Sequence, residues 1–153
     1  MRLVDDKASW TAAVDGFADR DFYHTWDYHA IAADEDERTL LFLYESERSA
    51  IALPLVVREG QIDATEFRDA TSVYGYPGPL AAGEYRNPEE IERFQRELRD
   101  ALQGLGLVTV FSRLNPLVGH DAVLDGLGER VVLSQTVAID LAEPADVAIS
   151  RYR

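Results

Sequence analysis

The segment after Asn87 constrains the fold most strongly, because it predicts one long helix with a single apolar stripe. Asn87 is a favoured helix cap, Pro88 suits the first helical position, and Gly104 or Gly106 predicts the end. Such a helix is stable only when its stripe packs against another hydrophobic layer. The stripe residues recur at spacings of three and four: Ile91, Phe94, Leu98, Ala101, Leu102 and Leu105.

The chain around this helix predicts a β-sheet as the missing layer. Apolar segments at 40–44 and 50–57, separated by a polar loop, predict a hairpin. Pro54 cannot donate a ladder hydrogen bond, so we expect it on an edge strand or at a bulge. Further extended segments are predicted at 62–74, at 107–113 as a buried strand, and at 131–133 and 136–141. The sequence therefore predicts a mixed α+β fold.

Two helices and a short strand are predicted near the N-terminus, and a last helix near the C-terminus. Residues 2–4 suit an edge strand, and Asp5 or Asp6 can cap the helix that follows. Thr25 predicts the cap of a second helix that extends through Ala33, whereas 75–83 reads as a turn-rich segment. Pro144 is well placed to begin a helix, which the chain interrupts at 153.

The charge and hydrophobicity of the chain restrict the classes of molecule that it can bind. Acidic residues number 28 against 15 basic ones, and Lys7 is the only lysine, so the net charge is −13. This excess has two open interpretations: a GC-rich genome that favours arginine, or adaptation to molar salt, as in a halophile. No basic face for DNA is visible, and no apolar run is long enough to span a membrane. We expect a cytoplasmic protein without disulfides, since the chain has no cysteine.

The most informative segment runs from Thr71 to Leu80. Tyr74 and Tyr76 flank Gly75 where the extended stretch ends, and Gly78 follows between two prolines. One interpretation is a loop that uses glycine and proline to turn, with tyrosines packed over the core. The other is a binding loop, in which phenol groups and glycine amides contact a polar ligand.

A second candidate cluster lies at 111–117. A predicted strand ends near Arg113 and is followed by Asn115 and Pro116. A guanidinium at the end of a strand suits recognition of a carboxylate or phosphate. The alternative is an ordinary ion pair with one of the many acidic side chains.

Signatures of an autonomous active site are missing from the sequence. There is no Walker A motif and no GxGxxG pattern, and Gly104 and Gly106 close a helix where a coenzyme A loop would open one. His24 and His29 are five residues apart and so face different sides of a helix, which argues against a shared metal site. We therefore predict no metal, no cofactor held by this chain, and no identifiable catalytic residue.

Taken together, these segments resemble the first domain of FemAB-like transferases, which are GNAT-related. The resemblance rests on four stretches: 21–29 (DFYHTWDYH), 69–80 (DATSVYGYPGPL), 111–117 (FSRLNPL) and 136–141 (TVAIDL). It implies a GNAT-like, largely antiparallel twisted sheet flanked by helices over 1–149. A second domain would begin within 150–153. The implied acceptor-binding residues are Tyr74, Gly75, Tyr76, Gly78, Arg113, Asn115 and Trp26.

The resemblance also implies a function. We expect the N-terminal half of a transferase that moves an aminoacyl or acyl group onto an amine, with this half binding a small-molecule or cell-envelope acceptor. Aminoacyl-tRNA or acyl-CoA would be the donor for the intact protein, and this chain alone would be inactive. The alternatives are a catalytically silent GNAT-like binding module and a domain that forms a homodimer through an exposed strand edge.

Overall fold

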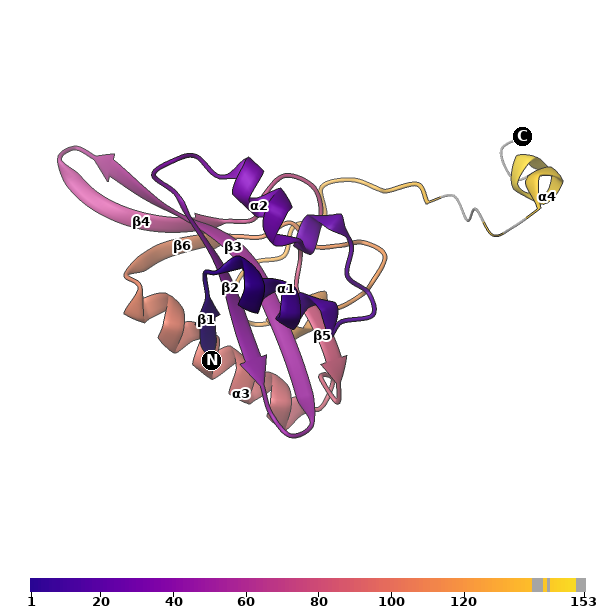
Figure 1. Cartoon of the computed structure of the whole chain (residues 1–153), viewed down its shortest axis with the longest axis horizontal. Helices are drawn as coiled ribbons and strands as arrows, with labels where there is room; N and C mark the ends of the chain where they lie inside the picture. The colour runs from indigo at the N-terminus through magenta and orange to yellow at the C-terminus, as the bar shows by residue number, and fades with distance from the viewer. Residues whose placement is uncertain (139–141, 143, 151–153) are drawn as a thin grey trace.

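The computed structural model describes residues 1–138, 142 and 144–150, which form a mixed α+β fold (Figure 1). The described part contains four α-helices, two short 3-10 helices and a six-stranded, mostly antiparallel open sheet, as the sequence predicted. The elements follow in this order: β1 (Arg2–Val4), α1 (Lys7–Asp15), η1 (Phe22–His24), α2 (Trp26–Ala32), β2 (Arg38–Glu45), β3 (Ser49–Ile62), β4 (Thr65–Thr71), β5 (Leu80–Gly83), α3 (Pro88–Gly104), β6 (Leu107–Phe111), η2 (Asp121–Leu124) and α4 (Ala145–Ser150).

The sheet has the order β1-β2-β3-β4-β6, and β5 pairs with β3 beyond the end of β4. Every pairing is antiparallel except that of β4 with β6. The connection between these two parallel strands contains α3, since parallel neighbours need a long crossover. The carboxyl ends of β4 and β6 therefore lie at the same end of the sheet.

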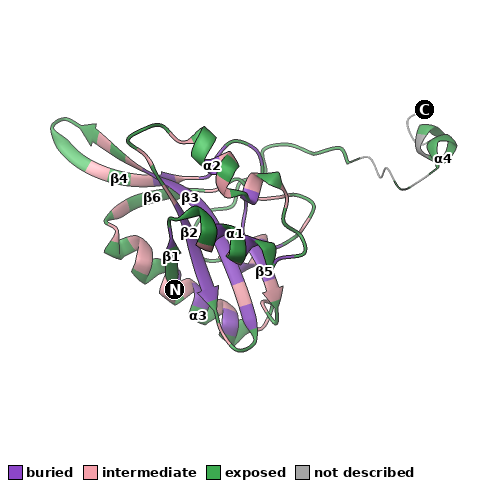
Figure 2. Ribbon diagram, in the orientation of Figure 1, coloured by how far each residue is buried: buried purple, intermediate pink, exposed green. Residues whose placement is uncertain are grey.

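Both faces of the central strands are buried, which explains their nearly continuous apolar sequence (Figure 2). Alternate residues of β2 point to opposite faces. Leu40 and Phe42 pack towards α3, with Phe94 and Leu98 of that helix, whereas Leu41 and Leu43 pack towards α1. The hydrophobic core therefore has two layers, one on each side of the sheet.

The predicted helix starts are confirmed. The Asn87 side chain accepts a hydrogen bond from the backbone N–H of Glu89 (2.9 Å), and Pro88 begins α3. Asp6, rather than Asp5, caps α1, and Thr25 caps α2. α4 begins at Ala145, directly after Pro144.

Pro54 lies in β3, which is an interior strand of the sheet. The prediction that Pro54 marks an edge strand or a bulge is therefore wrong for the strand as a whole. On one side Pro54 is paired with Leu41 of β2. On the other side β5 pairs only as far as Ala52, and β4 begins to pair at Val56. Pro54 thus occupies a local gap between two partner strands, where its missing N–H leaves no ladder bond unmade.

Two β elements differ from the sequence-based expectation. The stretch predicted as one extended segment from residue 62 is divided by a tight turn, in which Asp63 and Ala64 both have positive φ (47° and 65°). Such backbone suits a two-residue hairpin between β3 and β4. The segment predicted as turn-rich contains β5 at its end, because Leu80 and its neighbours pair with β3.

Three predictions near the C-terminus need correction. β6 is an edge strand and is largely exposed, not buried, because among the described strands it pairs with β4 alone. Residues 131–133 form no strand. Residues 136–138 form no strand either, and the rest of the strand predicted at 136–141 lies outside the described residues, as do 151–153.

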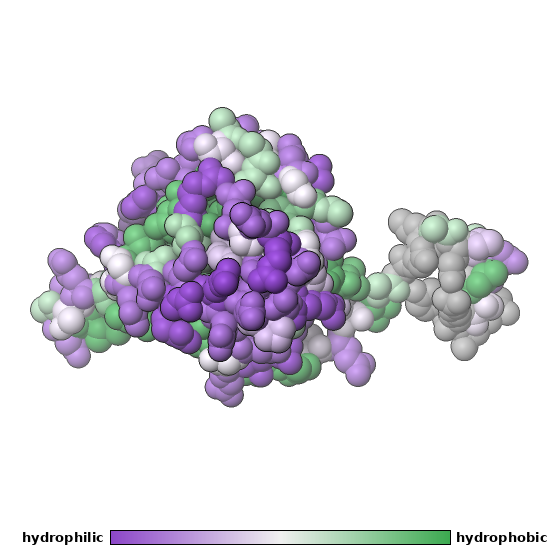
Figure 3. Space-filling view, turned by 90° about the horizontal axis from the view of Figure 1, so that it is seen from below, coloured by the Kyte–Doolittle hydropathy of each residue, from purple (hydrophilic) through white to green (hydrophobic). Residues whose placement is uncertain are grey.

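The outer face of α3 is hydrophilic. Figure 3 views the molecule from the side on which α3 lies, and charged and polar side chains dominate the middle of this face. This agrees with the alternation of buried Phe94 and Leu98 with exposed Glu and Arg along the helix. Within the described residues, no helix combines the length and apolar character that crossing a bilayer requires.

Candidate functional site

The two candidate clusters lie side by side because they follow the two parallel strands. Tyr74 comes shortly after the end of β4, and Arg113 shortly after the end of β6. The Ser72 backbone N–H donates to the carbonyl oxygen of Phe111 (2.8 Å), and the Arg113 N–H donates to Ser72 Oγ (3.0 Å). Ser72 thus ties both loops together, at the kind of sheet end where ligands commonly bind.

The guanidinium of Arg113 lies between two exposed rings. Its carbon is 5.7 Å from the centroid of the Tyr74 ring and 5.4 Å from that of Phe111. Tyr74 is 77% exposed and Phe111 is 51% exposed. These distances fall within the range of cation–π attraction, which holds the guanidinium over the rings without neutralising its charge.

Arg113 differs from most arginines of the chain in its partners. Among the described residues no carboxylate lies within ion-pairing distance of it, although Arg48, Arg58 and Arg68, for example, all form ion pairs. The ordinary ion pair that the sequence left open for Arg113 is therefore not formed with any described residue. The positive charge remains available to an anion from outside.

Gly75 and Gly78 let the loop pack closely. Gly75 has φ +97°, and a Cβ there would lie 2.1 Å from the ring of Tyr23. A Cβ on Gly78 would lie 3.0 Å from the backbone nitrogen of Asn115. Both glycines are buried, so the space that their missing side chains leave is filled by protein.

An aromatic cluster from η1 and α2 supports this loop. Tyr23 contacts Tyr76 edge to face, with ring centroids 6.2 Å apart, and Tyr28 at 5.5 Å. The hydroxyl of Tyr28 donates to the Tyr74 carbonyl oxygen (3.1 Å), and Phe22 stacks on Tyr23 (3.9 Å). Burial raises the pKa of Tyr23, with smaller contributions from Tyr28 and Asp21. We define the aromatic–guanidinium surface as the side chains of Phe22, Tyr23, Tyr28, Tyr74, Tyr76, Phe111 and Arg113.

Four members of this surface were not among the predicted site residues: Phe111, which lies within the candidate segment 111–117, and the three aromatic residues Phe22, Tyr23 and Tyr28. The signal for these three was the density of aromatic residues between 22 and 28, in a stretch that also carries part of the FemAB resemblance. Spacing alone could not show that these rings face the Tyr74 loop, because the two segments are about fifty residues apart in the chain.

Asn115 and Asp21 connect the loop after β6 to η1. The side-chain amide of Asn115 donates to Asp21 Oδ2 at 3.5 Å, and its Oδ1 accepts from the Leu117 N–H at 2.9 Å. Asp21 also caps η1, where its carboxylate accepts from the Tyr23 N–H (2.9 Å). Asn115 is thereby engaged by protein and positions the loop beside Arg113.

Trp26 lies in a neighbouring hollow of about 460 Å³ between α1 and α2. Its ring contacts the buried ring of Trp10 edge to face, with centroids 5.4 Å apart. Asp21 lines this hollow as well, so it borders both features. The structure therefore brings together all predicted site residues except Trp26, which lies in the neighbouring hollow and not in the loops that carry the others.

Two fully buried histidines lie beneath this region. His24 accepts from the Asp21 N–H through Nδ1 (3.2 Å), and its carbonyl oxygen accepts from Trp10 Nε1 (2.8 Å). His29 has Nδ1 3.0 Å from the Thr25 carbonyl oxygen. Burial lowers the pKa of both, that of His29 to about 4. Both rings are therefore neutral at pH 7, and neither reaches a ligand at the surface.

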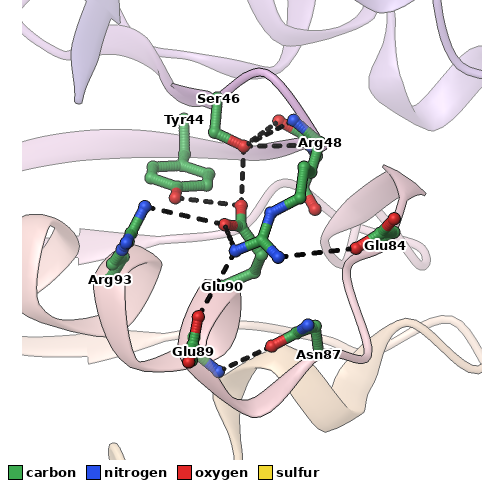
Figure 4. A network of polar contacts seen from close by, with 9 residues as sticks. Tyr44, Ser46, Arg48, Glu84, Asn87, Glu89, Glu90 and Arg93 are labelled. Carbon is green, nitrogen blue, oxygen red and sulfur yellow. Dashed lines mark hydrogen bonds and ion pairs between the residues drawn. The ribbon is translucent and has the colours of Figure 1, made fainter.

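A second polar cluster surrounds Glu90 in the first turn of α3 (Figure 4). The Glu90 side chain is only 1% exposed, and its carboxylate accepts from Ser46 Oγ (2.6 Å) and Tyr44 Oη (3.2 Å). Arg48 (3.2 Å) and Arg93 (3.9 Å) supply the opposite charge. The hydrogen bond from Ser46, followed by those from Tyr44 and Arg48, lowers the pKa of Glu90.

The Glu90 cluster is best explained as a structural lock. It joins the β2–β3 hairpin loop to the start of α3, and Arg48 also contacts Glu84 and Glu89. Because four protein groups already satisfy the carboxylate, it has little capacity left to bind a substrate. We therefore place the candidate site at the aromatic–guanidinium surface.

The described residues contain no group of three metal-ligating side chains close enough to hold an ion. Comparisons with models of protein families, with curated proteins and with solved structures give no match to this chain.

Proposed function

We propose that this chain supplies the acceptor-binding half of a FemAB-like transferase, and that the acceptor binds at the aromatic–guanidinium surface. The observation that carries the proposal is Arg113, whose charge has no described carboxylate partner in a chain of net charge −13. An exposed guanidinium framed by rings suits a ligand with an anionic group beside an apolar or sugar moiety.

The chemistry of transfer fits a division between two halves. Attack by a neutral amine on an activated carbonyl requires positioning and stabilisation of the oxyanion more than a covalent protein intermediate. Arg113 and the tyrosines would orient the acceptor. Since His24 and His29 are fully buried, a general base for the amine would come from the second domain that the resemblance implies.

A catalytically silent binding module is the second candidate. Among the described residues this surface has no accessible histidine, which fits a silent binding module as well as it fits half of a transferase, because binding needs no base. The two functions differ in what happens when a second domain is supplied: a transferase half gains turnover, whereas a silent module only binds.

Calorimetric titration tests the binding step common to both candidates. The probe is a muramyl tripeptide that ends in lysine, because it combines a sugar, carboxylates and a primary amine; acetyl-CoA serves as the donor-side contrast. We expect the tripeptide to bind and Arg113→Gln to weaken binding about tenfold or more, since a charged hydrogen bond to carboxylate contributes about 1.5–3 kcal/mol.

Arg99→Gln is the matched control, because it removes the same charge from the exposed side of α3. It is expected to bind like the unmodified chain. Equal binding by the Arg113 and Arg99 variants, or no binding of the tripeptide at all, would contradict the proposed site. Turnover by this chain alone would contradict the division of labour.

A further inference from the structure

The outer edge of β6 is unusual for an exposed strand. Among the described strands it pairs with β4 alone, so the other edge of its backbone is free. Val108, which falls at a register shift, is 68% exposed, and Val110 is 37% exposed. Charged residues make up 28% of the chain, yet β6 (LVTVF) contains none, nor a proline. Native edge strands usually carry such residues to prevent pairing with another chain.

A second uncovered apolar segment lies further along the chain. Residues 131–138 (VVLSQTVA) form no strand pairing with any described residue and are exposed throughout. Val132 is 85% exposed, Leu133 is 84% exposed, and this segment also lacks charge. Figures 1 and 3 show the segment leaving the body of the molecule, with hydrophobic residues along it.

We propose that two copies of this chain exchange these segments: residues 131–138 of each copy pair as an added strand with the free edge of β6 in the other. Strand addition would satisfy the open backbone groups of β6 and cover apolar side chains on both partners. The pairing leaves Arg113 and Tyr74 outside the contact, and it meets the acceptor surface only at Phe111, the last residue of β6.

A second copy fits this surface because each chain carries both halves of the contact. The edge and the added strand lie on one chain, so a two-fold arrangement uses each half once per copy and closes as a dimer. Both halves are apolar and uncharged, so the strong net charge of −13 is not concentrated at the contact.

Sedimentation velocity over a range of micromolar concentrations tests the exchange. We expect a species of twice the 17.1 kDa chain mass that dissociates on dilution. Val108→Lys should disrupt the edge, and Val132→Lys combined with Leu133→Lys should disrupt the added strand, so that each variant is monomeric. Ile31→Lys is the matched control, since Ile31 is 84% exposed on α2, and it should remain dimeric.

Mixing the two monomeric variants gives the sharper result. One retains an intact added strand and the other an intact edge, so the mixture should form heterodimers with one of the two pairings. A monomeric unmodified chain, which is the result if 131–138 folds back on its own β6, would overturn the proposal. So would a dimer that survives either variant. Circular dichroism of each variant confirms that it is folded.

Discussion

Burial of His29 predicts a specific loss of stability in mild acid. The ring is fully buried beside Trp10, at 4.9 Å between centroids, and its pKa is lowered from the usual 6.5 to about 4, chiefly by burial. The bond to the Thr25 carbonyl raises this pKa somewhat, and His24 lowers it. Above pH 6.5 the ring is neutral in both folded and unfolded chains, so stability is then complete.

The magnitude follows from the two pKa values. As pH falls below 6.5, His29 becomes protonated in the unfolded chain but stays neutral in the folded chain. The free energy of unfolding therefore decreases with falling pH, and this decrease ends once pH has fallen through about 4. The full shift corresponds to about 3 kcal/mol, of which about 2 kcal/mol is lost by about pH 5. Carboxylates add their own dependence, mainly at lower pH.

Urea unfolding at about pH 7.5 and about pH 5 measures this loss, with His29→Phe as the comparison. Phenylalanine preserves the ring against Trp10 but cannot titrate, and the remaining groups are the same in both proteins. We expect the unmodified chain to lose about 2 kcal/mol more than the variant between the two pH values. Equal losses, or an NMR titration that places the His29 pKa near 6, would refute the reasoning.

Three further outcomes are expected. Gly75→Ala should destabilise the fold by about 1–3 kcal/mol in urea unfolding, because it forces a side chain into a positive-φ position against Tyr23; a neutral effect would contradict the packing role. Glu90→Gln should make stability fall less steeply with acid, because the lowered pKa of Glu90 gives a contribution that is complete above pH 4.5 and is lost as pH falls through the pKa of the folded state. An unchanged dependence of stability on pH in this range would contradict the role of the Glu90 carboxylate. Phe94→Ala should cost about 3–5 kcal/mol by thermal or urea unfolding, since the ring is fully buried between α3 and the sheet, whereas a loss under about 1 kcal/mol would contradict the two-layer core.

Local signals predicted the helices and the central hairpin well. Asn87, Pro88 and the apolar stripe specify α3 by short-range physics, and caps at Asp6 and Thr25 do the same for α1 and α2. The hairpin turn at Asp63 and Ala64 was missed because Ala64 rarely adopts positive φ and stands where the usual Asp-Gly pair would have its glycine.

The sequence-based predictions were wrong mainly where the neighbouring strands determine whether a strand is buried or lies at an edge. An apolar strand such as β6 reads as buried in sequence, yet its burial depends on a neighbour that the described structure does not contain. Pro54 reads as an edge signal, but the divergence of β4 from β5 creates a gap inside the sheet that no local pattern reveals.

The candidate site was predicted in part. Tyr74 and Arg113 were found in separate segments and placed in one site only by the resemblance, whereas the parallel pairing of β4 with β6 is the physical reason that they lie together. The supporting rings of Tyr23 and Tyr28 depend on the packing of α2 against a loop distant in sequence.

NMR mapping of the muramyl tripeptide on the isotope-labelled chain tests the central claim most directly. We expect the side-chain Nε–Hε signal of Arg113 and the backbone amides of the Tyr74 to Gly78 loop to shift on titration, while signals on the outer face of α3 stay fixed. Saturable shifts confined to another face, or no shift at Arg113, would contradict the assignment of the acceptor site.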